Sequence, residues 1–270
     1  MKRQITSSRM NVNAGIMSWY VKELKTLTKR MTRECNERLA KIYRQLSPQI
    51  TFDDSISSQA RIALNELNKK YYDLYSKKSK QLVKKLLNKT NRYATGQFNQ
   101  YLKGMLGDNA KNFTLSGSAI SPEKAEIIKA LMFANTSLIK SIPDEYFKQI
   151  TGAVARSIEN GNGIKWLAKQ LREYGAKTDR RADLIAQDQT RKAYTSINLR
   201  NFQDNNIKKF KWLHSGGSRD PRDYHKNVLN GNVYDIDDPP VIDPKTGEKG
   251  YPGQLPYCRC TMAAVLDFED

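Results

Sequence analysis

WYVKELKTLTKRMTRECNERLAKIYRQL, residues 19–46, carries apolar side chains three and four residues apart, which is the spacing of one face of an α-helix. The residues of this apolar face are Tyr20, Leu24, Leu27, Met31, Cys35, Leu39, Ile42 and Leu46. Ser47-Pro48 is predicted to end the helix, because a proline disfavours helical backbone at the residue before it. Cys35 lies on the apolar face, so we interpret it as a small buried hydrophobic residue.

Residues 58–89 repeat this helical spacing, while their other faces are rich in lysine. Neither segment has enough apolar surface for a deep core, so residues 1–105 predict an elongated basic region built as an antiparallel helical hairpin. The glycine- and asparagine-rich stretch that follows has no helical periodicity, and it predicts a linker at residues 106–120. Residues 121–270 would then form the second domain.

The second half of the chain reads as helices followed by short strands. Helices are predicted at about 122–136, 143–160, 163–174 and 178–204, with breaks at Gly161-Asn162-Gly163 and Gly175. Strands are predicted at 208–213, 232–236 and 260–266. The expected fold class is therefore α+β and predominantly α-helical, with a basic helical N-terminal arm, a helical body and a small C-terminal β-sheet.

Positive charge is concentrated in the first part of the chain. The 270 residues carry 46 Lys and Arg against 28 Asp and Glu, a net charge of +18, and residues 1–120 hold 23 against 8. Such an excess attracts polyanions, and double-stranded DNA is the expected partner. The residues predicted to contact it are Lys69, Lys70, Lys77, Lys78, Lys80, Lys84, Lys85, Lys89 and Arg92. The alternative is that the lysines only keep a long helix soluble.

Several classes of protein are disfavoured by what the sequence lacks. Three cysteines, two of them in a Cys-x-Cys pair, do not make a disulfide framework and indicate a reducing compartment. No signal peptide or membrane-spanning segment is apparent, so no membrane partner is expected. Phosphate-binding loops of the Walker type, HExxH motifs and paired catalytic carboxylates are missing as well, and we expect no enzymatic activity.

The last sixty residues hold the most distinctive side chains, including both histidines and two of the three cysteines. Together with two positions on the preceding helix they form an ordered signature: Asp188, Asn198, Trp212, Asp220, His225, Gly231, Cys258, Arg259 and Cys260. From about residue 121 to 265 the chain resembles the phage Mu F-like family of head morphogenesis proteins. None of the short motifs is specific alone, and the resemblance depends on their order.

The resemblance implies a minor capsid protein of a tailed bacteriophage or prophage. Such a protein would be made in the host cytoplasm and would lie in the head interior of the virion, close to the portal. Its partners would be the portal protein and the major capsid or scaffold protein. Catalysis is not implied.

The C-terminal cluster contains residue types that bind zinc. Where relatives carry a Cys-x-x-Cys motif, this chain has Arg222 and His225 in place of the two cysteines. It therefore offers three zinc ligands, His225, Cys258 and Cys260. The candidates for a fourth ligand are Asp220, Asp223 and His214.

The sequence favours an arrangement without metal, and no cofactor is expected. Cys258 and Cys260 would both face the core from one strand, while His225 caps or hydrogen-bonds a neighbouring turn. Arg259 would point the other way and pair with Asp220 or Asp223. Asn230-Gly231 would form a tight turn with positive φ.

Two other functions stay open from the sequence. His225 lies among Arg219, Arg222 and Tyr224, a set that could serve a metal-independent nuclease of the toxin type. A nucleic-acid-binding protein with no place in a virion would explain the charge but not the C-terminal signature.

Overall fold

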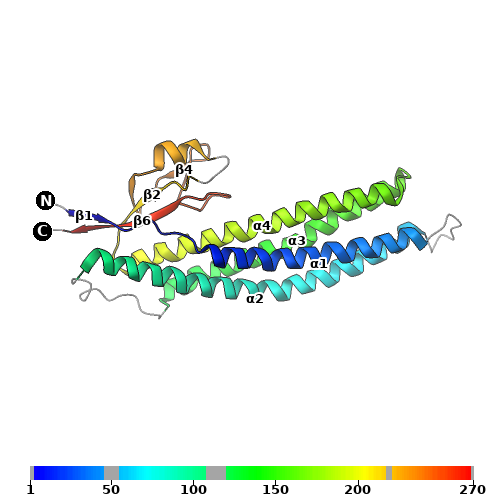
Figure 1. The fold of residues 1–270 in the computed structure, drawn as a ribbon, viewed down its shortest axis with the longest axis horizontal. Coiled ribbons are helices and arrows are strands. Elements are labelled where there is room, and N and C mark those ends of the chain that lie inside the picture. Colours follow the sequence, from blue (N-terminus) through cyan, green and yellow to red (C-terminus); the bar gives the residue numbers. More distant parts are fainter. Residues whose placement is uncertain (1–2, 46–54, 108–119, 217–220, 269–270) are drawn as a thin grey trace. The chain divides into compact units, whose positions relative to one another are not determined.

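The described residues form four long helices, a small four-stranded antiparallel sheet and a two-stranded one (Figure 1), which confirms the predominantly helical α+β class. The computed structural model describes residues 3–45, 55–107, 120–216 and 221–268. The helices are α1 (Ala14–Gln45), α2 (Ile56–Leu106), α3 (Pro122–Glu159) and α4 (Gly163–Asp204). The strands are β1 (Arg3–Thr6), β2 (Lys209–Leu213), β3 (Val233–Asp235), β4 (Val241–Asp243), β5 (Glu248–Lys249) and β6 (Thr261–Phe268). A π-helix spans His225–Leu229.

The first helix follows its predicted pattern closely. The side chain of Asn13 caps it by accepting a hydrogen bond of 2.9 Å from the backbone N–H of Ile16. Its buried residues are Tyr20, Leu24, Thr28, Met31, Cys35, Leu39 and Ile42. Cys35 is fully buried, as expected of a hydrophobic residue on the inner face.

Two of the predicted helix breaks were wrong. Helix α3 continues through Pro143, and α4 continues through Gly175. An interior proline costs about 3 kcal/mol, but Pro143 is flanked by buried Ile142 and Tyr146, whose packing favours the unbroken helix. At Gly175 an added Cβ would lie 3.7 Å from the side chain of Thr32, so this glycine lies at a helix contact. The break at 161–163 was right, since Gly161 and Gly163 have φ of 64° and 63°.

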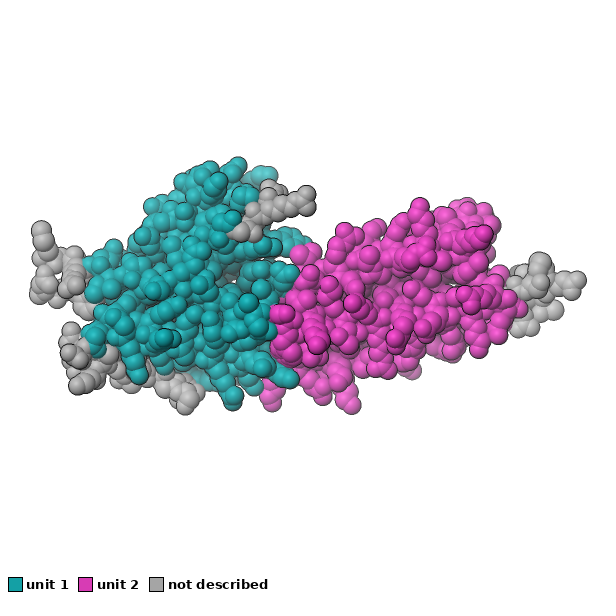
Figure 2. Space-filling view, viewed as in Figure 1, with its two compact units in different colours: residues 1–17, 85–131, 187–270 teal, residues 18–84, 132–186 magenta. Residues whose placement is uncertain are grey.

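The chain forms two compact units that interleave in sequence (Figure 2). Unit 1 comprises residues 1–17, 85–131 and 187–270, and unit 2 comprises residues 18–84 and 132–186. The predicted linker at 106–120 falls largely on residues 108–119, which lie outside the described residues. The proposed domain boundary at that linker stays a prediction.

In unit 2, segments of all four helices pack together. The hydroxyl of Tyr20 on α1 donates a hydrogen bond of 3.0 Å to Asn135 Oδ1 on α3, and the rings of Tyr71 on α2 and Phe147 on α3 lie 6.3 Å apart. Thr28 on α1 is hydrogen-bonded to Asp179 on α4. The two N-terminal helices therefore do not stand alone as the hairpin we expected, because α3 and α4 cover their apolar faces.

Unit 1 is built around a four-stranded antiparallel sheet in the order β1-β6-β2-β3, with Ile5 opposite Leu266 and Phe210 opposite Ala264. The predicted strands correspond to β2, β3 and β6. Strand β1 was not predicted, since four residues are too few for a period to be recognised. Strands β4 and β5 form a separate hairpin. Thus the N-terminal residues complete the sheet that the C-terminal residues begin.

Helix residues of unit 1 pack against this sheet to form one core. Its largest fully buried side chains include Phe98 of α2, Phe202 of α4, and Phe210 and Trp212 of β2. The rings of Phe98 and Phe202 lie 5.7 Å apart. This core supports the segment from the π-helix to β6, where the distinctive C-terminal side chains are found.

Candidate functional site

His225, Cys258 and Cys260 come together inside unit 1. His225 begins the π-helix, and the two cysteines lie just before β6. Their exposed fractions are 2%, 3% and 6%, and one ligand atom from each residue lies within 4.8 Å of the others. His225 Nδ1 is 3.5 Å from Cys258 Sγ and 3.8 Å from Cys260 Sγ.

The other ring nitrogen of His225 holds the ring in place. Nε2 lies 2.9 Å from the carbonyl oxygen of Ile242 in β4. A carbonyl can only accept a hydrogen bond, so Nε2 carries the proton. The ring also packs edge-on against the indole of Trp212, with centroids 5.1 Å apart. The orientation of Nδ1 toward the two sulfurs is therefore fixed from both sides.

The predicted alternation of buried cysteines and exposed arginine is present at residues 258–260, but these residues precede the strand. Cys258 and Cys260 are buried and Arg259 is exposed, while β6 begins only at Thr261. His225 does make a backbone hydrogen bond, although to β4 and not to its own turn. The expected ion pair of Arg259 with Asp220 or Asp223 stays a prediction, because Asp220 lies outside the described residues.

The hydrogen bond between the two thiols shifts their pKa values in opposite directions. The Cys260 side chain donates toward Cys258, and this lowers the pKa of Cys258 and raises the pKa of Cys260, which keeps its proton. Burial lowers the pKa of His225, but its hydrogen bonds with Cys258 and Ile242 outweigh burial, so the net change is upward. Of the two thiols, Cys258 is therefore the more acidic.

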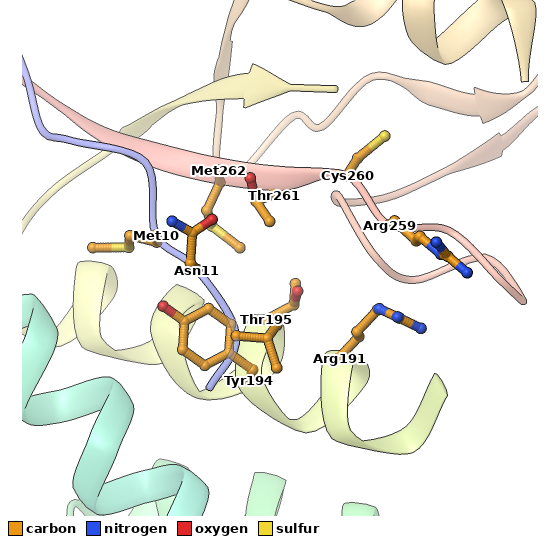
Figure 3. Close-up of a pocket in the computed structure, with 10 residues that line it drawn as sticks. Met10, Asn11, Arg191, Tyr194, Thr195, Arg259, Cys260, Thr261 and Met262 are labelled. Carbon is orange, nitrogen blue, oxygen red and sulfur yellow. The ribbon is translucent and has the colours of Figure 1, made fainter. Parts of the chain in front are cut away.

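A pocket of about 200 Å³ lies beside Cys260 (Figure 3). Its lining residues are Met10, Asn11, Val12, Arg191, Tyr194, Thr195, Arg259, Cys260, Thr261 and Met262. Burial lowers the pKa of Arg191, and the positive charge of Arg259 lowers it further. Sequence reasoning missed Arg191 and Thr195, because the pocket combines residues near 10, 191 and 260 that only the tertiary structure brings together.

The remaining signature residues support the backbone around the cluster. Asp188 on α4 forms an ion pair of 3.0 Å with Lys192 and accepts a hydrogen bond of 3.3 Å from the backbone N–H of Tyr257. Asn198 is fully buried and donates to the carbonyl of Tyr194. Gly231 has φ of 85°, so the predicted tight turn with positive φ is present.

The nine predicted DNA-contacting residues are all exposed side chains of α2. Lys69, Lys70, Lys77, Lys78, Lys80 and Lys84 belong to unit 2, and Lys85, Lys89 and Arg92 belong to unit 1. Lys70 pairs with Glu34 of α1, so part of its charge is already compensated. Their contact with DNA stays a prediction.

The surroundings of His225 disfavour the nuclease alternative. Its ring is buried, with one nitrogen bonded to a carbonyl and the other directed at two sulfurs. Arg222 donates a hydrogen bond of 3.0 Å to the carbonyl of Pro256 and so supports the adjacent loop. A base or nucleophile for phosphodiester cleavage needs access to substrate, which this ring does not have.

Comparison with known proteins gives two matches. Residues 148–263 match the family model described as "Phage Mu protein F like protein". A protein of Haemophilus influenzae strain Rd, named only as an uncharacterized protein, is 26% identical over 254 residues. The match covers 92% of this chain and 53% of the relative, so the chain spans about half the length of that protein. No solved structure matches significantly. Among the described residues, no helix is both long and apolar enough to cross a membrane.

Proposed function

Since residues 148–263 match the model of the Mu F-like family, we propose that this chain is a minor capsid protein that acts in head morphogenesis of a tailed phage or prophage. It associates with the portal and with the capsid or scaffold protein inside the procapsid, and it contacts packaged double-stranded DNA. The family match is the observation that carries the proposal. No step of this function requires catalysis by the chain.

The lysines of α2 support contact with DNA because of their spacing. Lys70, Lys77 and Lys84 follow one another at intervals of seven residues, and so do Lys78, Lys85 and Arg92. Seven residues are close to two helical turns, so each series follows one face of the helix. The buried residues between them, such as Leu67, Tyr71 and Tyr75, face inward. The positive charges therefore remain on the solvent side, where phosphates can approach.

Presence in the virion is the direct test of the proposed role. We expect mass spectrometry of purified particles to detect the full chain, and the cognate portal protein to co-purify with it after co-expression. The whole chain must be used, since truncation at residue 105 would remove Met10 and Phe98 from the core of unit 1. Absence of the chain from both particles and procapsids would refute the virion role and favour the non-virion alternative.

DNA binding is expected to lack sequence preference and to depend steeply on salt. If six or more phosphates are contacted, affinity should fall by about 10³-fold between about 50 and 200 mM salt. The combined variant Lys77→Gln, Lys78→Gln and Lys84→Gln should bind more weakly and flatten the log–log salt slope by about one for each lost contact. Fluorescence anisotropy with a labelled duplex measures both quantities.

The matched control removes the same charge elsewhere in unit 2. Lys148, Lys165 and Lys169 are exposed on α3 and α4, and changing all three to glutamine leaves the lysines of α2 intact. This variant should keep most of the affinity and nearly the same slope. If both triple variants weaken binding equally, net charge alone explains the attraction and the α2 surface has no special role.

A further inference from the structure

We propose that His225, Cys258 and Cys260 bind a zinc ion. The three residues supply one imidazole nitrogen and two sulfurs, the donor set that zinc prefers in proteins. All three cysteines of the chain are free thiols, so Cys258 and Cys260 are available as ligands. The fourth coordination position falls to a water molecule.

The distances within the cluster fit a shared metal ion. In a tetrahedral site with ordinary Zn–S and Zn–N bonds, a sulfur and a nitrogen ligand lie about 3.6 Å apart. The two separations from His225 Nδ1, 3.5 Å to Cys258 Sγ and 3.8 Å to Cys260 Sγ, lie on either side of this value. The two nitrogen–sulfur separations thus match those of a tetrahedral zinc site, and all three ligand atoms lie within 4.8 Å of one another.

The surroundings of His225 prepare it as a ligand. The Nε2–H bond to the carbonyl of Ile242 leaves the lone pair on Nδ1, the nitrogen that faces the sulfurs. Metal-binding histidines generally donate their second N–H to a carbonyl or carboxylate in this way. The single lone pair of Nδ1 accepts only one thiol proton, whereas a metal ion bonds to the nitrogen and both sulfurs at once.

Backbone amides surround the two sulfurs as well. The Cys258 sulfur accepts hydrogen bonds from the backbone of Cys260 and Gly253, and the Cys260 sulfur accepts one from Ser215. Such N–H groups stabilise thiolate charge. Gly253 has φ of 82°, and its conformation brings the loop before Cys258 back toward that sulfur. The loop backbone therefore stabilises negative charge on both sulfurs, including the charge that Cys260 acquires when a metal ion displaces its proton.

A bound ion would join three parts of the chain that secondary structure alone does not connect. These are the start of the π-helix at His225, the segment before β6, and, through the Ile242 carbonyl, strand β4. The segment from residue 221 to residue 260 is otherwise poor in regular structure. Zinc would therefore close this segment onto the sheet, and the whole chain should melt at higher temperature with zinc than without it.

The decisive experiment measures zinc in the full-length protein. We expect chain purified under reducing conditions without chelator to contain about one zinc per molecule by elemental mass spectrometry. His225→Ala, Cys258→Ser and Cys260→Ser should each lose this zinc. The matched control, Cys35→Ala in unit 2, should retain it. Far-UV circular dichroism verifies that each variant keeps its helices.

A titration of the wild-type chain keeps the test valid even if the cluster variants do not fold. Metal-free protein titrated with Co²⁺ should develop thiolate-to-cobalt absorption that saturates at about one equivalent, together with the intense visible bands of tetrahedral cobalt. Zinc should then displace the cobalt and abolish both signals. Wild-type protein without zinc that also gives no thiolate–cobalt signal would overturn the proposal. Zinc retained by Cys258→Ser but lost by Cys35→Ala would do the same.

Discussion

Replacing Trp212 with alanine is expected to lower the free energy of unfolding by about 3–5 kcal/mol, the range found when a large core aromatic side chain is removed. Trp212 is fully buried in β2, the strand between β3 and β6, and its ring packs against His225. The variant leaves a cavity in the core of unit 1 that neighbouring side chains fill only in part. Urea unfolding followed by circular dichroism measures the loss.

A second tryptophan provides the control for this prediction. Trp166 on α4 is only partly buried and lies in unit 2, so Trp166→Ala should cost no more than about 1–2 kcal/mol. Trp212→Phe keeps most of the apolar volume and should fall between wild type and Trp212→Ala. If Trp166→Ala is as destabilising as Trp212→Ala, the core of unit 1 is not the dominant contribution that its packing indicates.

Replacing Asn201 with alanine is the second large effect that we expect, with a loss of about 2–4 kcal/mol. Lys124 of α3 is only 3% exposed, and its Nζ donates hydrogen bonds of 2.6 Å to Asn201 Oδ1 and 3.2 Å to Thr95 Oγ1. Asn201 lies on α4 and Thr95 on α2, so one ammonium group connects three helices. Alanine removes its shortest hydrogen bond and leaves the buried charge poorly solvated. Chemical denaturation at neutral pH measures the loss.

The pH dependence identifies the charge as the cause. Burial lowers the pKa of Lys124 in the folded state, so the unfolded chain binds more protons and stability from this group rises as pH increases toward its unfolded value near 10.4. Losing Asn201 should lower the folded pKa further. The difference in unfolding free energy between wild type and Asn201→Ala should therefore shrink as pH is raised from about 7 to about 10.

A double-mutant cycle with Lys124→Met completes this test. When methionine replaces the lysine, no buried ammonium needs the Asn201 oxygen, and Asn201→Ala should cost clearly less than in the wild-type background. An undiminished loss in the Lys124→Met background would contradict the interpretation. In that case Asn201 would contribute through its other side-chain hydrogen bonds, in which its Nδ2 donates to Asn198 Oδ1 and its Oδ1 accepts from Thr95 Oγ1.

Several elements could be predicted because their signals are local. The spacing of Tyr20, Leu24 and Met31 predicts α1, and short runs of β-forming residues predict β2, β3 and most of β6, whereas β4 and β5 were not predicted. The Cys-Arg-Cys alternation correctly predicts which side chains are buried. The helix prediction placed interruptions between residues 136 and 143 and at Gly175. Both were wrong, because the local cost of Pro143 and of Gly175 is smaller than the packing free energy of the long helices.

The sequence by itself determined the helical fold class, the positive charge along α2 and the resemblance of the C-terminal half to a phage family, since periodicity, composition and motif order are all readable in one dimension. Only the tertiary structure decided that β1 pairs with β6, that α3 and α4 cover the N-terminal helices within unit 2, and that one nitrogen of His225 faces both Cys258 and Cys260. These arrangements depend on pairings between residues far apart in the chain, whose free energies come from burial and hydrogen bonds that no local pattern records.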